Sequence, residues 1–170
     1  GALELWMLDR DELVRQEKLA GLRELRAVSG GCLLRSASED GGHALLVTHE
    51  GDIQTLPTDG KVTAIGTSGR TLLVATGKQI LEFDASGALT HRYSASAGIS
   101  AMTRVDATRL AVGYVSGAIE LVSTGITKEA DPLATKPIYS FEKTASNRVT
   151  RILAGPLDTV IVGYANGLVG

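Results

Sequence analysis

Residues 110–122, LAVGYVSGAIELV, contain a short apolar segment, a turn that ends in Gly117, and a second apolar segment. Fifty residues later, residues 160–169 read VIVGYANGLV and repeat this pattern. Ser-Gly and Asn-Gly suit a two-residue turn of type I′, because that turn requires positive φ at both central residues, which Gly adopts readily and Asn tolerates. The two segments therefore predict two copies of one β-hairpin, and such a repeat guides the interpretation of the whole chain.

Further copies of this hairpin occupy much of the remaining sequence. Residues 1–6, GALELW, align position by position with residues 117–122, GAIELV. A third copy has its turn at Glu50 and a fourth has its turn at Lys78. We expect repeat units of three or four antiparallel strands to open at four apolar residues: Leu33, Val62, Ile99 and Val149.

The repeat divides the chain into five parts. Residues 1–31 contain the end of one unit and a connection, residues 32–61, 62–98 and 99–148 are one unit each, and residues 149–170 are an incomplete unit. The longest irregular stretch, between Ser123 and Arg148, is expected to contain a surface excursion at 128–132 and an outer strand at 137–141.

Two interpretations remain open for residues 9–28. Asp9 followed by Glu12 has the spacing of a capping box, and apolar residues then recur at every third position, which indicates a helix. The repeat instead favours an outer strand over residues 12–19, followed by a connection.

Composition and charge restrict the class of protein. The 170 residues include 20 glycines but only four prolines, two phenylalanines and one tryptophan, which is typical of thin strands joined by tight turns. The net charge of −2 provides no positive field for nucleic acid, so nucleic acid is not an expected partner. No apolar run approaches the ~18 residues of a membrane span, and the single Cys32 excludes an internal disulfide. We therefore expect a cytoplasmic protein with no membrane partner.

Small antiparallel sheets cannot bury both faces alone, so repeats of this kind stack their sheets. The predicted order of inner strand, hairpin, outer strand and connection resembles the β-propeller, and within that class the WD40 repeat family. The resemblance rests on residues 1–6, on ILEFD at 80–84 and on the Asn166-Gly167 turn, which match that family's turn Gly, alternating apolar residues and final Trp-Asp. Trp6 is followed by Met7 rather than Asp, so the chain resembles a divergent member.

The resemblance implies an all-β fold, a β-propeller or partial propeller of about four blades. Propellers have about 4–8 blades, and an open arc exposes strand edges that recruit other strands. The expected partners are therefore a protein or peptide and, for completion of the ring, a second copy of the chain or missing blades of the same chain. Bacterial propellers of this type are often fused to signalling domains such as serine/threonine kinases, which implies a part of a larger regulatory protein.

No group of residues points to catalysis, to a metal or to a cofactor. His43, His49 and His91 lack a second ligand at a metal-binding spacing. Cys32 lies beside apolar residues, which favours a buried small side chain over a nucleophile. The acidic turn at Glu39 contains Gly, which favours a solvated turn over acid–base catalysis. Phosphate-binding glycine loops and the Gly-x-Ser-x-Gly motif do not occur in the sequence.

We therefore expect a non-enzymatic interaction scaffold that presents the loops of one rim to a protein or peptide. In a propeller, the turns between second and third strands share a rim with the connections into each new unit. Five partner-binding residues are expected there: Glu50, Lys78, Ser116, Arg148 and Asn166. Arg151 is interpreted as a residue of a solvated edge. Two alternatives remain, namely a propeller that is an enzyme or binds a small ligand over its central channel, and a structural repeat that only assembles with itself.

Overall fold

A computed structural model describes residues 2–7, 12–19, 21–37, 42–68, 70–106, 108–123, 147–156 and 159–170. Within these ranges the chain forms fifteen β-strands in five antiparallel sheets and contains no helix. The predicted all-β fold of repeated antiparallel sheets is therefore confirmed. The surface excursion expected at 128–132 and the outer strand expected at 137–141 lie outside the described residues.

Each sheet consists of strands that follow one another in the chain. The first sheet contains β1 (Ala2–Met7) and β2 (Glu12–Lys18). The second contains β3 (Leu22–Val28), β4 (Gly31–Ser36), β5 (Ala44–Thr48) and β6 (Ile53–Thr55). The third contains β7 (Val62–Ser68), β8 (Thr71–Thr76), β9 (Gln79–Phe83) and β10 (Leu89–Ser94). The fourth contains β11 (Ile99–Arg104), β12 (Arg109–Tyr114) and β13 (Ile119–Ser123), and the fifth contains β14 (Val149–Ala154) and β15 (Val160–Tyr164).

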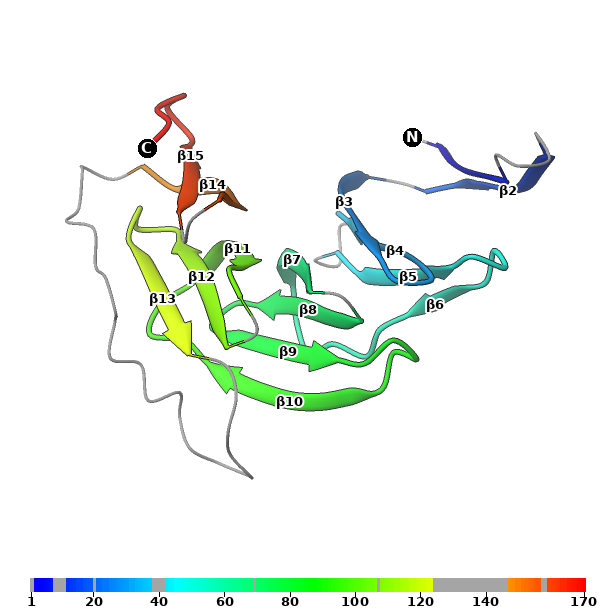
Figure 1. The fold of residues 1–170 in the computed structure, drawn as a ribbon, viewed down its shortest axis with the longest axis horizontal. Coiled ribbons are helices and arrows are strands. Elements are labelled where there is room, and N and C mark those ends of the chain that lie inside the picture. Colours follow the sequence, from blue (N-terminus) through cyan, green and yellow to red (C-terminus); the bar gives the residue numbers. More distant parts are fainter. Residues whose placement is uncertain are drawn as a thin grey trace.

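The sheets follow one another along an open arc, with β1 and β2 at one end and β14 and β15 at the other (Figure 1). A separate apolar cluster joins each sheet to the next. The clusters are represented by Leu3 with Leu34, by Leu33 with Leu81, by Leu73 with Met102, and by Ala111 with Ile152. The second, third and fourth sheets therefore pack on a neighbour at both faces, which is how a stacked repeat builds its core.

The first strand of each of the later four sheets carries the same β-bulge. The register shifts between Leu22 and Glu24 in β3, and at the corresponding points of β7, β11 and β14. The extra residue places Leu22 and Leu25 on one face of β3 although they are three positions apart. This bulge explains the three-residue spacing of Leu22 and Leu25, whereas Val28 lies on the opposite face of β3 and packs on the third sheet.

The helix interpretation of residues 9–28 is wrong for the residues described there, since β2 and β3 are both strands. β2 agrees with the strand expected over residues 12–19. β3, however, pairs with β4 and opens the second sheet, where a connection was expected. That sheet therefore begins at Leu22 rather than at residue 32.

The hairpin of residues 110–122 forms as predicted, by pairing of β12 with β13, but its turn differs in type. The Gly117 amide donates a hydrogen bond to the Tyr114 carbonyl at 3.0 Å, and Gly117 itself has φ of +89°. The loop is thus the three-residue form, in which a turn is followed by a glycine with positive φ, rather than a two-residue type I′ turn. The corresponding Gly167 has φ of +85° and makes the same bond to Tyr164.

Candidate functional site

The strands β3, β7, β11 and β14 run side by side in one direction along the concave side of the arc (Figure 1). Thr67 near the end of β7 donates its hydroxyl to the Ala27 carbonyl near the end of β3, at 3.2 Å. Ser100 near the start of β11 donates to the Val149 carbonyl at the start of β14, at 2.7 Å. We call these four the inner strands. The end of the sheets at which they begin is the proximal rim, and the end at which they terminate is the distal rim.

Four of the five residues expected on one rim lie on the proximal rim: Lys78, Ser116, Arg148 and Asn166. Backbone hydrogen bonds hold this rim together, since the Ala95 amide donates to the Lys78 carbonyl at 2.6 Å and the Ala165 amide donates to the Arg148 carbonyl at 2.9 Å. A Cβ on Gly117 would lie 2.6 Å from the Asn147 carbonyl oxygen, so the turn that contains Ser116 abuts the connection into β14. The turns and connections of neighbouring sheets therefore form one continuous surface.

The side chains of these four residues are exposed. Two of them also help to close their own turns, because Ser116 Oγ accepts the Ala118 amide at 3.4 Å and Asn166 Oδ1 accepts the Leu168 amide at 3.2 Å. Lys78 and Arg148 contribute exposed positive charges to the same rim. The rim thus combines a fixed backbone with accessible polar groups.

A hydrogen-bond network around the buried Tyr114 lies at the proximal rim. The Tyr114 hydroxyl donates to Glu120 Oε2 at 2.5 Å, and the Ser96 hydroxyl donates to Glu120 Oε1 at 3.1 Å. Burial raises the pKa of Tyr114, and the hydrogen bond to Glu120 raises it further, so Tyr114 stays a protonated donor. The network links the connection before β11 to β12 and β13, and so holds these segments together at the proximal rim.

Glu50 does not share the proximal rim, so its predicted place beside Lys78 is wrong. It lies in the turn between β5 and β6, and the adjacent His49 amide donates to the Gly30 carbonyl at 2.9 Å. Gly30 follows the end of inner strand β3, which places Glu50 on the distal rim. The prediction failed because the second sheet begins with β3, one strand earlier than expected. The turn that contains Glu50 therefore joins the third and fourth strands of this sheet, whereas the prediction placed it between the second and third.

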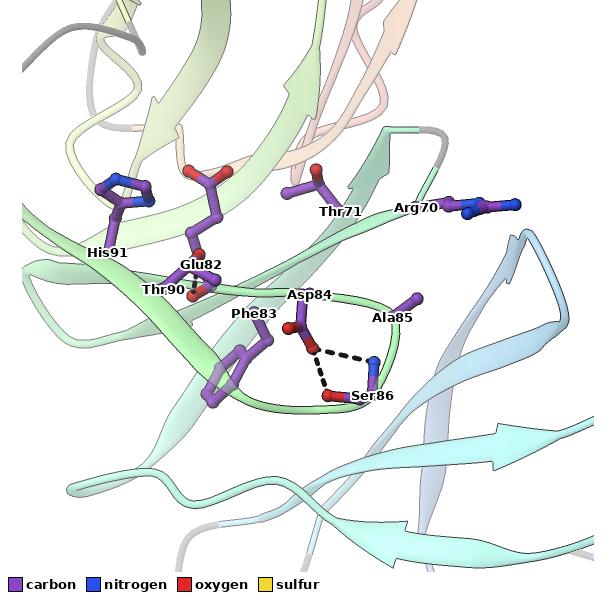
Figure 2. Close-up of a pocket in the computed structure, with 9 residues that line it drawn as sticks. All are labelled: Arg70, Thr71, Glu82, Phe83, Asp84, Ala85, Ser86, Thr90 and His91. Atoms are coloured by element: carbon purple, nitrogen blue, oxygen red, sulfur yellow. Dashed lines mark hydrogen bonds between the residues drawn. The ribbon is translucent and has the colours of Figure 1, made fainter.

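The distal rim contains a hollow of about 460 Å³ (Figure 2). Its wall comes from the starts of β8 and β10, from the end of β9 and from the turn after it. Its lining residues are Arg70, Thr71, Glu82, Phe83, Asp84, Ala85, Ser86, Thr90 and His91.

Two polar groups of this hollow, Asp84 and Ser86, stabilise the turn between β9 and β10. Asp84 Oδ1 accepts the Ser86 amide at 2.8 Å and the Ser86 hydroxyl at 2.6 Å. These bonds lower the pKa of Asp84 and close the turn into β10. Figure 2 shows the Glu82 and Arg70 side chains apart from each other, and the Phe83 ring directed to the opposite side of the strand from Glu82. The Ser86 hydroxyl is therefore a turn-closing donor, and these groups do not converge on a common point.

A charged cluster that the sequence did not indicate lies on the concave side. Glu24 on β3 contacts Arg26 at 2.7 Å, Arg35 at 3.3 Å and Arg151 at 3.7 Å. Arg151 comes from β14, so this ion pair joins two inner strands that belong to different, non-adjacent sheets. Arg151, interpreted from the sequence as a solvated edge residue, thus spans the opening of the arc.

The remaining candidates show no joint arrangement. His91 stacks on Tyr93 with 6.1 Å between ring centroids. Cys32 is half-buried, and this burial raises the pKa of its thiol. Among the described residues, no group of three or more His, Cys, Asp or Glu side chains is placed to hold a metal ion. The part of the chain that the structure describes also has no helix long and apolar enough to cross a membrane.

Comparison with known proteins shows the fold alone. No protein-family model matches the sequence, and no curated protein matches it. The solved structures similar to this chain include the computationally designed Ika4 protein, with 14% identity, a TM-score of 0.63 and 91% coverage of each chain. They also include BBS1N in complex with ARL6DN, with 14% identity and a TM-score of 0.63; that match covers 99% of this chain and 57% of the BBS1N chain. The chain is therefore similar in fold to these proteins at low sequence identity.

Proposed function

We propose that the chain is a section of a divergent WD40-like β-propeller that acts as a non-enzymatic scaffold in the cytoplasm. In this proposal the proximal rim binds a protein or peptide partner, and the section belongs to a larger regulatory or signalling protein. The expectation comes from the repeat in the sequence and from the absence of a catalytic motif in it. Fold does not determine function, so the proposal depends on the rim itself.

The observation that carries the proposal is the construction of the proximal rim. Its turns are tied to the connections by backbone hydrogen bonds, while Lys78, Ser116 and Arg148 remain exposed. A fixed backbone reduces the ordering cost that binding incurs, and loops on a rigid scaffold are common binding surfaces. The exposed Lys78 and Arg148 favour a partner segment that carries carboxylates.

A peptide array with acidic, neutral and basic sequences tests this function. The double variant Lys78→Glu, Arg148→Glu should weaken capture of acidic peptides, because two exposed positive charges of the rim are reversed. The matched control is Glu50→Lys, a charge reversal on the distal rim, which should retain capture. Thermal unfolding should be similar in all three proteins, since these side chains are exposed. Equal capture by the double variant and the unmodified protein would remove the proximal rim from the account.

The Glu24 cluster favours a second candidate, the binding of a small anion on the concave side. Three guanidinium groups surround one carboxylate, which leaves an excess of positive charge at this point. Isothermal titration with inorganic phosphate should show binding that Arg151→Gln weakens. Absence of heat with phosphate, together with unchanged acidic-peptide capture, would leave only the proximal rim as the functional surface.

A further inference from the structure

One position of the repeat is buried in the third, fourth and fifth sheets and exposed in the second sheet. This position lies three residues after the residue that precedes the bulge of each inner strand, and it is occupied by Leu25, Ile65, Met102 and Ile152. Ile65, Met102 and Ile152 have exposed fractions of 0%, 2% and 1%, because each packs on the preceding sheet. Leu25 is 51% exposed. Among the described side chains, Leu3 of β1 packs on Leu34 and Val47 of the second sheet, and Leu25 is not part of this cluster.

The other end of the arc shows the complementary surface. We call the face of each sheet that is directed to the following sheet its outward face. On the fourth sheet, Ala111 is fully buried, and a Cβ on Gly113 would lie 2.5 Å from Val149 Cγ1 and 3.0 Å from Ile152 Cδ1. On the fifth sheet, the corresponding Ile161 is 47% exposed, and its cross-strand neighbour Leu153 is 48% exposed.

The two surfaces that form the contact between neighbouring sheets elsewhere in the arc are therefore both uncovered at its two ends. The outward face of the fifth sheet is equivalent to the face of the fourth sheet on which β14 packs. Leu25 is equivalent to Ile152, the residue of β14 that makes this contact. The Arg151–Glu24 ion pair shows that β14 and β3 border one opening, and Figure 1 shows them on its two sides. β1, which borders the same region, pairs only with β2 among the described strands and so has an edge that can accept another strand.

We propose that this opening is a docking slot for a β-hairpin that repeats the pattern of β14 and β15. The first strand of the hairpin packs on Gly163 and Ile161, as Val149 and Ile152 pack on Gly113. Its opposite face covers Leu25, and its second strand pairs with the free edge of β1, which is the β-augmentation mode of peptide recognition. The two hairpin strands and β1 with β2 then form a four-stranded sheet, like β3 to β6 and β7 to β10.

The occupant is a hairpin with apolar residues on both faces, because Leu25 lies on one wall of the slot and the Leu153–Ile161 pair lies on the other, beside Arg151. A hairpin with one polar face would leave either Leu25 or the Leu153–Ile161 pair in contact with polar groups. Two strands are required, since four is the number of strands in the second and third sheets and the first sheet has two.

Binding of a synthetic peptide tests the slot. The probe has the sequence of residues 147–166, which spans β14 and β15, and its affinity for the purified protein is measured by fluorescence anisotropy. Leu25→Glu and Ile161→Lys should each weaken binding at least tenfold, because each places a charge in one wall. Both residues are about half-exposed, so neither variant disturbs the buried core. The control Leu89→Glu, at a 37% exposed leucine of outer strand β10, should bind like the unmodified protein.

Absence of peptide binding, or equal affinity in all variants, would overturn the proposal. A scrambled peptide that binds equally well would also overturn it, because the hairpin pattern is then irrelevant. Light scattering identifies the rival occupant: dimers that Leu25→Glu abolishes and that the peptide does not displace would assign the slot to a second copy of the chain. The variant Lys78→Glu, Arg148→Glu should keep hairpin binding, so failure of the slot and failure of the proximal rim give different results.

Discussion

The fourth and fifth sheets carry the same repeat pattern, but only the fourth has its outward face covered. Gly113 and Gly163 occupy equivalent positions in β12 and β15. A Cβ on Gly113 would collide with Val149, whereas a Cβ on Gly163 would make only ordinary contacts, at 3.6 Å to Thr150 Oγ1 and 3.7 Å to Arg151 Cβ. The difference teaches that the repeat encodes an interface at every sheet, and that the presence of a neighbour decides whether it is buried.

The largest expected effect separates the two equivalent inner-strand residues Ile152 and Leu25. Ile152→Ala should lower the free energy of unfolding by about 2–5 kcal/mol, because it removes a buried side chain and leaves a cavity between the last two sheets. Leu25→Ala should cost less than about 1 kcal/mol, because this side chain is half-exposed. Urea unfolding of both variants measures the difference, and equal losses would mean that Leu25 is buried in solution.

A smaller effect is expected for the two glycines. Gly113→Ala should destabilise the protein by about 1–3 kcal/mol, because its methyl group overlaps Val149 in a packed interface. Gly163→Ala should change stability by no more than about 0.5 kcal/mol, because nothing lies closer than 3.6 Å to the added carbon. The same substitution should weaken binding of the hairpin peptide. Thermal unfolding combined with the anisotropy assay checks both statements, and a stability loss at Gly163 that equals the loss at Gly113 would contradict them.

The smallest expected effect lies in the turn between β11 and β12 of the covered fourth sheet. The Thr108 amide, which donates to Asp106 Oδ1 at 2.7 Å, and the Arg109 guanidinium lower the pKa of Asp106 from 3.8 to about 2. A lowered folded-state pKa contributes stability that is present above the unfolded pKa and is lost as pH falls through the folded pKa. Asp106→Asn should therefore melt slightly below the unmodified protein at about pH 5, and this gap should narrow as pH falls to about 2 and below. A melting-temperature gap that stays constant over this window would show that the carboxylate charge plays no part.

Much of the fold follows from the sequence because the hairpins are local. The apolar alternation of residues 110–122 and the glycine that ends its turn predicted β12 and β13. The copy at residues 160–169 predicted β15, and its second strand forms as an isolated bridge between Val169 and Gly163. β3 was missed as a strand because its bulge gives Leu22 and Leu25 a three-residue spacing that also fits a helix. The place of Glu50 was wrong for the same reason, since an unrecognised first strand shifts every later turn of that sheet to the other rim.

The candidate surfaces were less predictable, because they depend on contacts between residues that are distant in sequence. Lys78 and Ser116 could be placed on one rim from the repeat alone. The contact between Glu24 and Arg151 could not be predicted from the repeat, because it depends on the curvature of the whole arc. The exposure of Leu25 and Ile161 also has no local signal, because the same repeat positions are buried wherever a neighbouring sheet is present.

The most direct test of the slot is photo-cross-linking with the hairpin peptide. A photoreactive group at the peptide position that corresponds to Ile152 should cross-link to the protein near Gly163, because Ile152 packs on the equivalent Gly113. A group at the position that corresponds to Ile161 should cross-link near Leu25, on the other wall, and mass spectrometry of the digested complex locates both sites. Cross-links at these two places would establish that the two uncovered faces are halves of one interface. Labels that react elsewhere, or that both react with the same wall, would contradict it.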